Sequence, residues 1–406
     1  MKYDFTSILE RKGKDALAVD FLGKMPGFAP SLPKDGFDPI PMWVADMNFP
    51  SAPSITKAIS ERLSHPLFGY FSPRKEYFDS IINWHSVRNG VRDLSGECIG
   101  YENGVLGGVI SALNVFCSRG DKVLVHSPTY IGFTNALGNN GYRIVHSPLY
   151  IDADGVWRMD YKDMEQKLRD EHIHAAIMCS PHNPTGRVWN MEELEQAMEL
   201  FRKYDVNVIS DEIWSDIILD SNRHIPVQSV SEDARMRTVA LYAPSKTFNL
   251  AGMVGSYHII YNKKIRERVL KESSLCDYNN MNVLSMYALI GAYSNEGMEW
   301  TDELCSVLSG NVSFACNYIA GHFKGVSVCK PEGTYMLFVD LSNWCEAHSK
   351  TIQDVEKACW DVGAAVQDGT MFHGNCHIRM NLALPFSKVK EAFERIDKYV
   401  LNRGGN

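Results

Sequence analysis

The strongest structural signal in the chain is the stretch Ala175-Ala176-Ile177-Met178-Cys179-Ser180-Pro181-His182-Asn183-Pro184-Thr185-Gly186. Its first five residues form a short apolar run bounded by turn residues, which is typical of a buried strand. The Pro- and Gly-containing turn that follows ends the strand at Cys179. The polar side chains of this turn therefore lie directly beyond the carboxyl end of a strand.

A helix is predicted after this strand. Asn190 is a good N-cap with Glu193 three residues later, and apolar residues then recur with helical spacing at Leu194, Met198 and Phe201. The strand pattern recurs in other runs, namely residues 122–126, 142–145, 207–210, 238–242 and 257–261. Strands that alternate with helices form crossover units, so we predict an α/β fold with a mostly parallel sheet covered on both faces.

The pattern changes near residue 300. Helical patterns at 263–275 and 281–296 precede the change. A smaller α+β unit follows, with a further helix and then expected elements at 334–339 (strand), 351–361 (helix) and 377–381 (strand). We predict an N-terminal arm over 1–45, a large domain over 46–295 and a small α+β domain over 296–406. The arm has too little periodic structure to stand alone, so it is expected to pack on the small domain.

Composition excludes several classes of protein. The 406 residues are 45% hydrophobic and 22% charged, which is ordinary for a folded chain and unlike a disordered one. The net charge is −8, without blocks of like charge, so we expect neither nucleic acid nor an anionic membrane as a partner. A small polar molecule is the expected partner.

Cysteine usage and the N-terminal sequence indicate the cytoplasm. The chain has ten cysteines and no C-x-x-C motif, which is typical of reduced thiols in a large chain. It shows neither an export signal nor 18 consecutive apolar residues. Two groups of candidate metal ligands, His172 with His174 and His373 with Cys376 and His377, lack a recognisable zinc spacing, so we expect no metal site.

Three functional groups follow successive predicted strands. Asn183 follows the strand at 175–179, Asp211 follows the next, and Lys246 follows the strand at 238–242. Ligands of open α/β sheets bind beyond the carboxyl ends of the strands. An amide, a carboxylate and an amine are therefore expected at one edge. Each alone could be a turn, a cap or a solvated lysine, but their joint occurrence indicates a site.

In these residues the chain resembles the fold-type I pyridoxal-phosphate (PLP) enzymes, in the class I/II aminotransferase group. The resemblance rests on Asn-Pro-x-Gly at 183–186, Asp-x-x-aromatic at 211–214 and Ser-Lys at 245–246. Other segments are similar to the branch that contains cystathionine β-lyase and cystalysin, namely Tyr3-Asp4-Phe5, Val44-Ala45-Asp46-Met47-x-Phe49, Phe68-Gly69-Tyr70, Ser180-Pro181-His182-Asn183-Pro184 and Ala243-Pro244-Ser245-Lys246-Thr247-Phe248-Asn249. The resemblance implies the PLP-dependent transferase-like fold and pyridoxal 5′-phosphate as cofactor.

The resemblance also implies roles for single residues. Lys246 would form the Schiff base with the cofactor and move the substrate Cα proton, and Asp211 would keep the ring nitrogen protonated. Asn183 would contact the ring phenolate oxygen and the substrate, and Tyr130 would stack on the ring. Lys246, Asp211, Tyr130 and Tyr70 are the expected catalytic residues.

The phosphate site implied by the resemblance lies in Glu102-Asn103-Gly104-Val105-Leu106-Gly107-Gly108, before an apolar helix predicted over 109–116. Gly104 permits close approach of the backbone, and a helix N-terminus favours an anion. The amides of Val105 and Leu106 would bind the phosphate, with Ser245 nearby. Tyr70 would reach the phosphate from a neighbouring subunit, which implies a homodimer with shared active sites.

Arg379 resembles the arginine that clamps the substrate α-carboxylate through a planar, bidentate contact. Trp43 and Ala45 of the arm would line the other side of the substrate. The partner expected from this set is a small-molecule substrate, an L-amino acid.

Three positions depart from the family pattern. Trp214 stands where relatives carry Tyr or His near the phenolate oxygen, and indole can donate a hydrogen bond but cannot titrate. It either changes the tuning of the cofactor or simply packs. Val254 stands where aspartate-aminotransferase relatives place an Arg on the phosphate. Ile131 replaces the second tyrosine of cystalysin-like enzymes.

The predicted function is that of a PLP-dependent C–S β-lyase of amino-acid metabolism, which cleaves cystathionine or other S-substituted L-cysteines to thiol, pyruvate and ammonia. The alternative is an aminotransferase that transfers the amino group of an L-amino acid to a 2-oxo acid. A third reading is a non-catalytic PLP-binding regulator.

Overall fold

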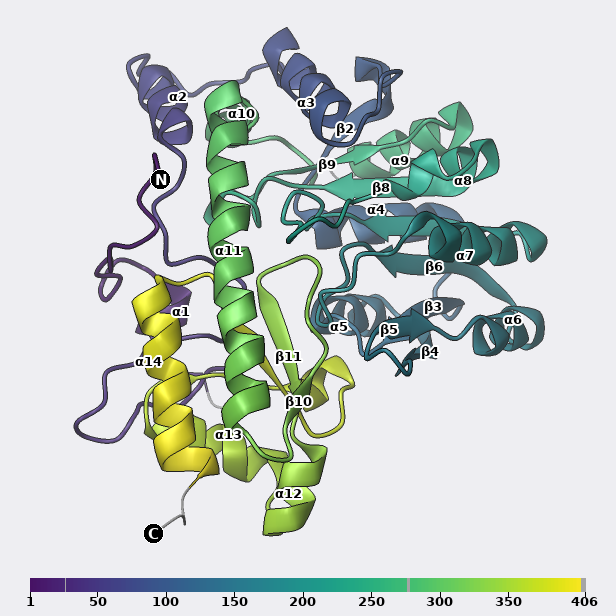
Figure 1. Ribbon diagram of the computed structural model, residues 1–406. Helices are drawn as coiled ribbons and strands as arrows, with labels where there is room; N and C mark the ends of the chain where they lie inside the picture. The colour runs from purple at the N-terminus through teal and green to yellow at the C-terminus, as the bar shows by residue number, and fades with distance from the viewer. Residues whose placement is uncertain (26, 276–277, 403–406) are drawn as a thin grey trace.

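The computed structural model describes residues 1–25, 27–275 and 278–402. Within these residues, eight strands form a mixed sheet in the order β2-β9-β8-β7-β6-β3-β4-β5 (Figure 1). Their bounds are β2 Ile99–Glu102, β3 Lys122–Ser127, β4 Arg143–Ile151, β5 Trp157–Met159, β6 Ile173–Cys179, β7 Asn207–Asp211, β8 Thr238–Tyr242 and β9 Ser256–Ile259. The strands from β8 to β4 run parallel, and β9 and β5 run antiparallel to their neighbours. The prediction of a mostly parallel sheet is confirmed.

Helices cover both faces of this sheet because its central strands are apolar on both sides. On one face, Val123 and Val125 of β3 pack in a cluster with α4 Val105–Phe116, α5 Ile131–Asn139 and α9 Lys263–Ser274. On the other, Leu124 packs in a cluster with α6 Tyr161–Asp170, α7 Met191–Lys203 and α8 Glu232–Arg237. α7 begins after Asn190, and the predicted capping box between Asn190 and Glu193 is present.

Two predicted helices have different bounds in the structure. The helix expected over 109–116 begins four residues earlier, at Val105, directly after Gly104. The helix expected over 281–296 is two helices, α10 Val283–Ala292 and α11 Asn295–His322. Ser294 caps α11 by accepting from the Gly297 N–H. A Cβ atom on Gly297 would lie 1.8 Å from the Ala292 carbonyl oxygen, so a glycine is required for this close break.

A smaller unit follows α10. An antiparallel sheet with the order β10-β11-β14-β13 is built from β10 Ser327–Val328, β11 Met336–Asp340, β13 Gln367–Asp368 and β14 His377–Asn381. The helices of this part of the chain are α11, α12 Ser342–His348, α13 Ile352–Asp361 and α14 Phe386–Ile396. The long α11 packs against α14 and, in the view of Figure 1, runs from near α10 toward α13.

The N-terminal residues lie against this smaller unit. β1 Ile40–Pro41 pairs with β12 Ala364–Ala365, and Lys2 forms an ion pair with Glu299 of α11. The short helix α1 Leu17–Asp20 precedes β1, and α2 Pro53–Leu63 and α3 Lys75–Arg88 lead into the large sheet. These contacts favour the three-part division at residues 45 and 295, which stays a prediction.

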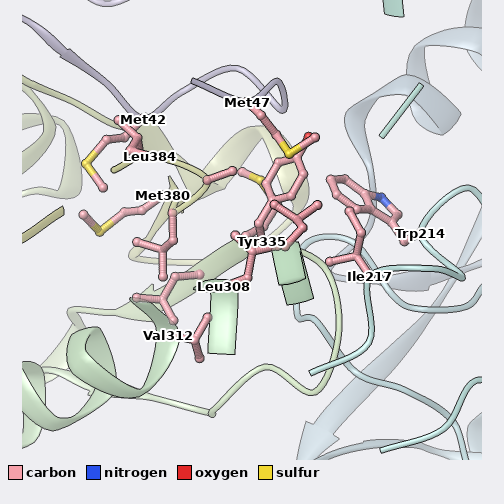
Figure 2. Packing of buried hydrophobic residues seen from close by; sticks show 14 of the residues in the cluster. Met42, Met47, Trp214, Ile217, Leu308, Val312, Tyr335, Met380 and Leu384 are labelled. Atoms are coloured by element: carbon pink, nitrogen blue, oxygen red, sulfur yellow. The ribbon is translucent and has the colours of Figure 1, made fainter. Parts of the chain in front are cut away.

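The largest apolar cluster joins the parts of the molecule. Figure 2 shows Met47 beside Tyr335, with Trp214 and Ile217 next to it, and Met42 of the arm beside Leu384. The same cluster includes Leu308 and Val312 of α11 and Met380 of β14. Trp214 and Tyr335 are thus fixed by the core, a point that matters for the site. Among the described residues, no helix combines the length and the apolar character that a bilayer crossing requires.

Candidate active site

A cavity of about 460 Å³ lies at the carboxyl ends of β3, β6, β7 and β8, where the arm and the smaller unit meet the large sheet. Almost all the predicted site residues line it: Trp43, Ala45, Gly104, Val105, Leu106, Tyr130, Asn183, Asp211, Trp214, Ser245, Lys246 and Arg379. Ile131 and Val254, two of the positions that depart from the family pattern, line it as well. The predicted residues that follow different strands therefore do meet in one place.

Tyr70 is the predicted site residue that the fold does not bring into this cavity. Its side chain is fully exposed, in a segment between α2 and α3 that forms no helix or strand. A role at a phosphate would therefore require a second copy of the chain. The assignment of Tyr70 stays a prediction.

Asp211 is the last residue of β7 and is buried beneath the cavity. Its carboxylate accepts one hydrogen bond, from the Ile213 N–H at 3.0 Å. Burial raises the pKa of the Asp211 carboxyl to about 7, against the opposing effects of this hydrogen bond and of the Lys246 charge. Because a single hydrogen bond offsets little of the cost of burying this negative charge, the carboxylate is a good partner for a cation, such as a protonated ring nitrogen.

Lys246 follows β8 and extends from the sheet edge toward the arm. Its Nζ donates to the Ala45 carbonyl at 2.9 Å and lies 5.6 Å from the centre of the Trp214 ring. Burial, and next the nearby Arg379 charge, lower the pKa of Lys246 to about 8. Close to neutral pH a useful fraction of this amine is therefore uncharged, as a nucleophile or general base must be.

Tyr335 completes the surroundings of Lys246. Its hydroxyl donates to the same Ala45 carbonyl at 2.9 Å, and its ring packs edge-on against Trp214 with 4.7 Å between ring centres (Figure 2). The sequence analysis did not identify Tyr335 as a site residue. It comes just before β11 of the smaller unit, and its only sequence signal was membership of a strand-like run.

Arg379 lies in the middle of β14 and is buried. One terminal nitrogen donates to the Trp43 carbonyl at 3.0 Å and to Gln367 Oε1 at 2.7 Å, and the other donates to Asn183 Oδ1 at 3.4 Å. Its Nε has no partner among the described residues, and burial lowers the pKa of the guanidinium to about 10. Because its three acceptors are neutral, the cation is well suited to a carboxylate ligand.

Gln367 is a second residue that the sequence analysis missed. It lies on β13 directly opposite Arg379 in the antiparallel pairing, so it aligns the guanidinium from the neighbouring strand. Phe372 supports the same group, with the guanidinium carbon 4.2 Å from its ring centre. These partners could not be inferred from the sequence because the register between the two strands was unknown.

The end of the cavity near α4 fits an anion. Gly104 has φ +82°, and a Cβ atom there would meet no neighbour within 4 Å. The N–H groups of Val105 and Leu106 belong to the first turn of α4, where helix N–H groups have no partner within the helix. Together with Ser245, which lines the same cavity, these groups fit a phosphate.

Tyr130 follows β3 and faces the cavity beside this anion site. Burial raises the pKa of its phenol, which therefore stays protonated. A Cβ atom on Gly132 would lie 2.2 Å from Tyr130 Cε1, so the glycine makes room for the ring. An aromatic ring, a buried carboxylate, an amine and an anion site thus surround one cavity, and this set fits pyridoxal phosphate.

The fold and this cavity define the class of protein. A family model described as aminotransferase class I and II matches residues 40–396, and the chain belongs to this family. The resemblance and the fold predicted from the sequence are thereby confirmed.

Individual relatives extend this finding. The chain is similar to a cystathionine beta-lyase, PatB, of Bacillus subtilis (strain 168), with 32% identity over 95% of this chain and 97% of the relative. Among solved structures, it is similar to the PLP-containing cystalysin of Treponema denticola, with TM-score 0.89, 30% identity and coverage of 98% and 99%. It is also similar to a PLP-bound C–S lyase of Staphylococcus hominis, with TM-score 0.88, 28% identity and 99% coverage of both chains.

Proposed function

We propose that the chain is a PLP-dependent C–S β-lyase that cleaves cystathionine or another S-substituted L-cysteine to a thiol, pyruvate and ammonia. The observation that carries the proposal is the meeting of Lys246, Asp211 and Arg379 in one cavity. It is supported by the similarity to proteins named cystathionine beta-lyase, cystalysin and C–S lyase.

When bound, PLP supplies an electron-accepting ring that makes the substrate Cα–H acidic enough to be removed. Asp211 holds a proton at the ring nitrogen, because its buried carboxylate gains a cationic partner there. Arg379 holds the α-carboxylate and so fixes the direction of the Cα–H bond. Lys246 binds the cofactor and removes the Cα proton at Nζ, which its lowered pKa of about 8 permits.

The remaining residues bind and orient. Gly104, Val105, Leu106 and Ser245 hold the phosphate. Tyr130 would stack on the ring, and Asn183, which accepts a hydrogen bond from Arg379, would contact its phenolate oxygen. Trp214, whose ring lies 5.6 Å from Lys246 Nζ, would border the cofactor.

We also propose that the chain works as a cytoplasmic homodimer in which Tyr70 of one copy serves the phosphate of the other. The full exposure of Tyr70, outside the cavity of its own chain, supports this arrangement. Analytical ultracentrifugation of the holoenzyme tests the dimer, and the PLP affinity of the Tyr70→Phe variant tests the role of Tyr70. A monomeric holoenzyme with full activity would contradict it.

The central test measures pyruvate released from L-cystathionine and S-methyl-L-cysteine by the purified holoenzyme without added keto acid. A lyase turns over many times, whereas an aminotransferase needs a 2-oxo acid for each further turnover. Lys246→Ala should abolish the reaction, and mass spectrometry after borohydride reduction should place the cofactor on Lys246. The proposal fails if only keto-acid-dependent transamination, or no turnover at all, is observed.

A further inference from the structure

Asp216 is a buried carboxylate that the proposed function leaves without a role. It lies beyond Asp211, in the segment that follows β7. We propose that Asp216 is a positioning residue: through a hydrogen bond with Thr247, it fixes the turn that carries Lys246 relative to Asp211. The inference deepens the proposed function and rests on it, since it takes Asp211 to act at the ring nitrogen and Lys246 at the Cα proton.

The contacts of Asp216 hold its carboxylate in one orientation. Oδ2 accepts a hydrogen bond from the Thr247 hydroxyl at 3.1 Å, and Oδ1 accepts one from Trp84 Nε1 of α3 at 2.8 Å. Arg88 Nε of the same helix lies 3.6 Å from Oδ1. Thr247 and Trp84 are both buried, so a rotation of the carboxylate would leave a buried donor without its partner. All these groups belong to one chain, so the arrangement does not depend on a second copy.

The segment from Asp211 to Asp216 is itself held firmly. Glu212 is buried, and its N–H donates to the Leu241 carbonyl of β8 at 2.9 Å. The Glu212 carbonyl accepts a hydrogen bond from the Ser215 N–H at 3.0 Å, which closes a turn. The Glu212 carboxylate is hydrogen-bonded to four groups, namely the Ser210 hydroxyl, the Val227 N–H, the His224 ring and the Tyr242 hydroxyl. Asp216 therefore stands at a fixed position relative to Asp211.

The turn that carries Lys246 lies beyond the end of β8, outside the sheet. The Phe248 N–H donates to the Pro244 carbonyl at 2.9 Å across this turn. Thr247, the residue after Lys246, ties the turn to Asp216. An error of about 1 Å in placing a reacting group can cost about a hundredfold in rate, so this contact bears directly on the transfer of the Cα proton.

The first test measures a proton transfer that a lyase and an aminotransferase share. The holoenzyme is incubated with L-alanine in deuterium oxide, and exchange of the Cα proton is followed by NMR. Thr247→Val, which nearly keeps the shape of the side chain but loses its hydroxyl, should lower the maximal exchange rate at least about tenfold and change KM less than about threefold, because Arg379 is untouched. Thr247→Ser keeps the hydroxyl and should recover most of the rate. Pyruvate release by the wild type is assayed separately, so a failure of the lyase proposal and a failure of this inference are distinguishable.

The second test needs no cofactor. Trace acetylation of Lys246 by acetic anhydride in the cofactor-free protein, quantified by mass spectrometry over a range of pH, reports the pKa of this amine, which burial lowers to about 8. In Thr247→Val the amine is freer to move toward water, so its pKa should rise by at least about half a pH unit. The charged groups that act on Lys246, namely Arg379, Asp46 and Asp211, are the same in this variant and in the wild type.

Thr301→Val is the matched control, because Thr301 is equally buried and its hydroxyl donates to the Gly297 carbonyl within α11. The control should change neither the exchange rate nor the pKa of the amine. Trp84→Phe removes the other donor to Asp216 and should move both quantities in the same direction as Thr247→Val, so the inference is tested even if Thr247→Val fails to fold. The inference is overturned if Thr247→Val and Trp84→Phe match the wild type in both quantities, or if the control shifts them as much.

Discussion

Asp211→Asn should stabilise the cofactor-free protein while it damages cofactor binding. The amide has nearly the shape of the carboxylate and can still accept the hydrogen bond from the Ile213 N–H. What the substitution removes is the buried negative charge. Burial raises the pKa of this carboxyl from its ordinary value of 3.8 to about 7 in the folded protein.

The size and pH dependence of the effect follow from these two values. At about 1.4 kcal/mol per pH unit, the difference corresponds to about 4 kcal/mol of unfolding free energy lost by the wild type above pH 7. The loss begins near pH 4, where the unfolded chain ionises first, and it is complete above pH 7. The gain of Asp211→Asn should therefore be about 2 kcal/mol at pH 5 and about 4 kcal/mol at pH 8.5.

Urea unfolding of the cofactor-free wild type and variant at pH 5 and pH 8.5 measures this gain. Asp154→Asn is the matched control, because Asp154 is exposed and its replacement should change stability little at either pH. In the same preparation, the variant should bind PLP much more weakly, since the ring nitrogen loses its partner. An equal gain at both pH values, or no gain at pH 8.5, would refute the assignment of a costly buried charge to Asp211.

Four further outcomes are expected. Arg379→Lys should lower kcat/KM about a hundredfold, mainly through KM in steady-state assays, because a point charge cannot reproduce the bidentate fork; an unchanged KM would contradict the clamp. Trp214→Phe keeps the edge-on contact with Tyr335 and should cost less than tenfold in kcat/KM, with a shifted pH profile, whereas a complete loss would mean that the indole N–H is essential. Tyr335→Phe should lower the free energy of unfolding, measured by chemical denaturation, by about 1 kcal/mol, because the hydrogen bond to the Ala45 carbonyl is lost. An unchanged unfolding free energy would argue against that hydrogen bond. Gly104→Ala should lower the free energy of unfolding by about 1–3 kcal/mol, because a residue with a Cβ atom is strained at φ +82° even though no neighbouring atom blocks it. The variant should also bind PLP more weakly in a fluorescence titration. Normal PLP affinity would exclude Gly104 from the phosphate site.

Much of the site could be predicted because it follows the strands directly. Mostly apolar runs mark β6, β7 and β8, and Asn183, Asp211 and Lys246 lie at the ends of these strands or within four residues of them. Parallel strands place such residues at one edge whatever the details of packing. The same reasoning gave the start of α7, since Asn190 and Glu193 signal their helix locally.

The residues that were missed depend on contacts between distant segments. Tyr335 reaches the site because the smaller unit packs against the arm, and Gln367 does so through the register of β13 and β14. The break between α10 and α11 was missed for a related reason. The predicted helix over 281–296 ends just before Gly297, and the close approach of Gly297 to Ala292 that accompanies the break is a contact that no pattern of single residues reveals.

The charges of the site form a consistent set when they are considered together. Burial shifts the pKa of Asp211 up to about 7, that of Lys246 down to about 8 and that of Arg379 down to about 10, in each case toward the uncharged form. Desolvation therefore opposes all three charges in the cofactor-free protein. A protonated ring nitrogen would pair with the Asp211 carboxylate and an α-carboxylate with Arg379, whereas an aldehyde carbon would react with the uncharged Lys246 amine. The arm supplies the Trp43 carbonyl that accepts a hydrogen bond from Arg379 and the Ala45 carbonyl that accepts one from Lys246. Loss of the arm should therefore disturb both side chains, even though none of the three charged site residues belongs to the arm.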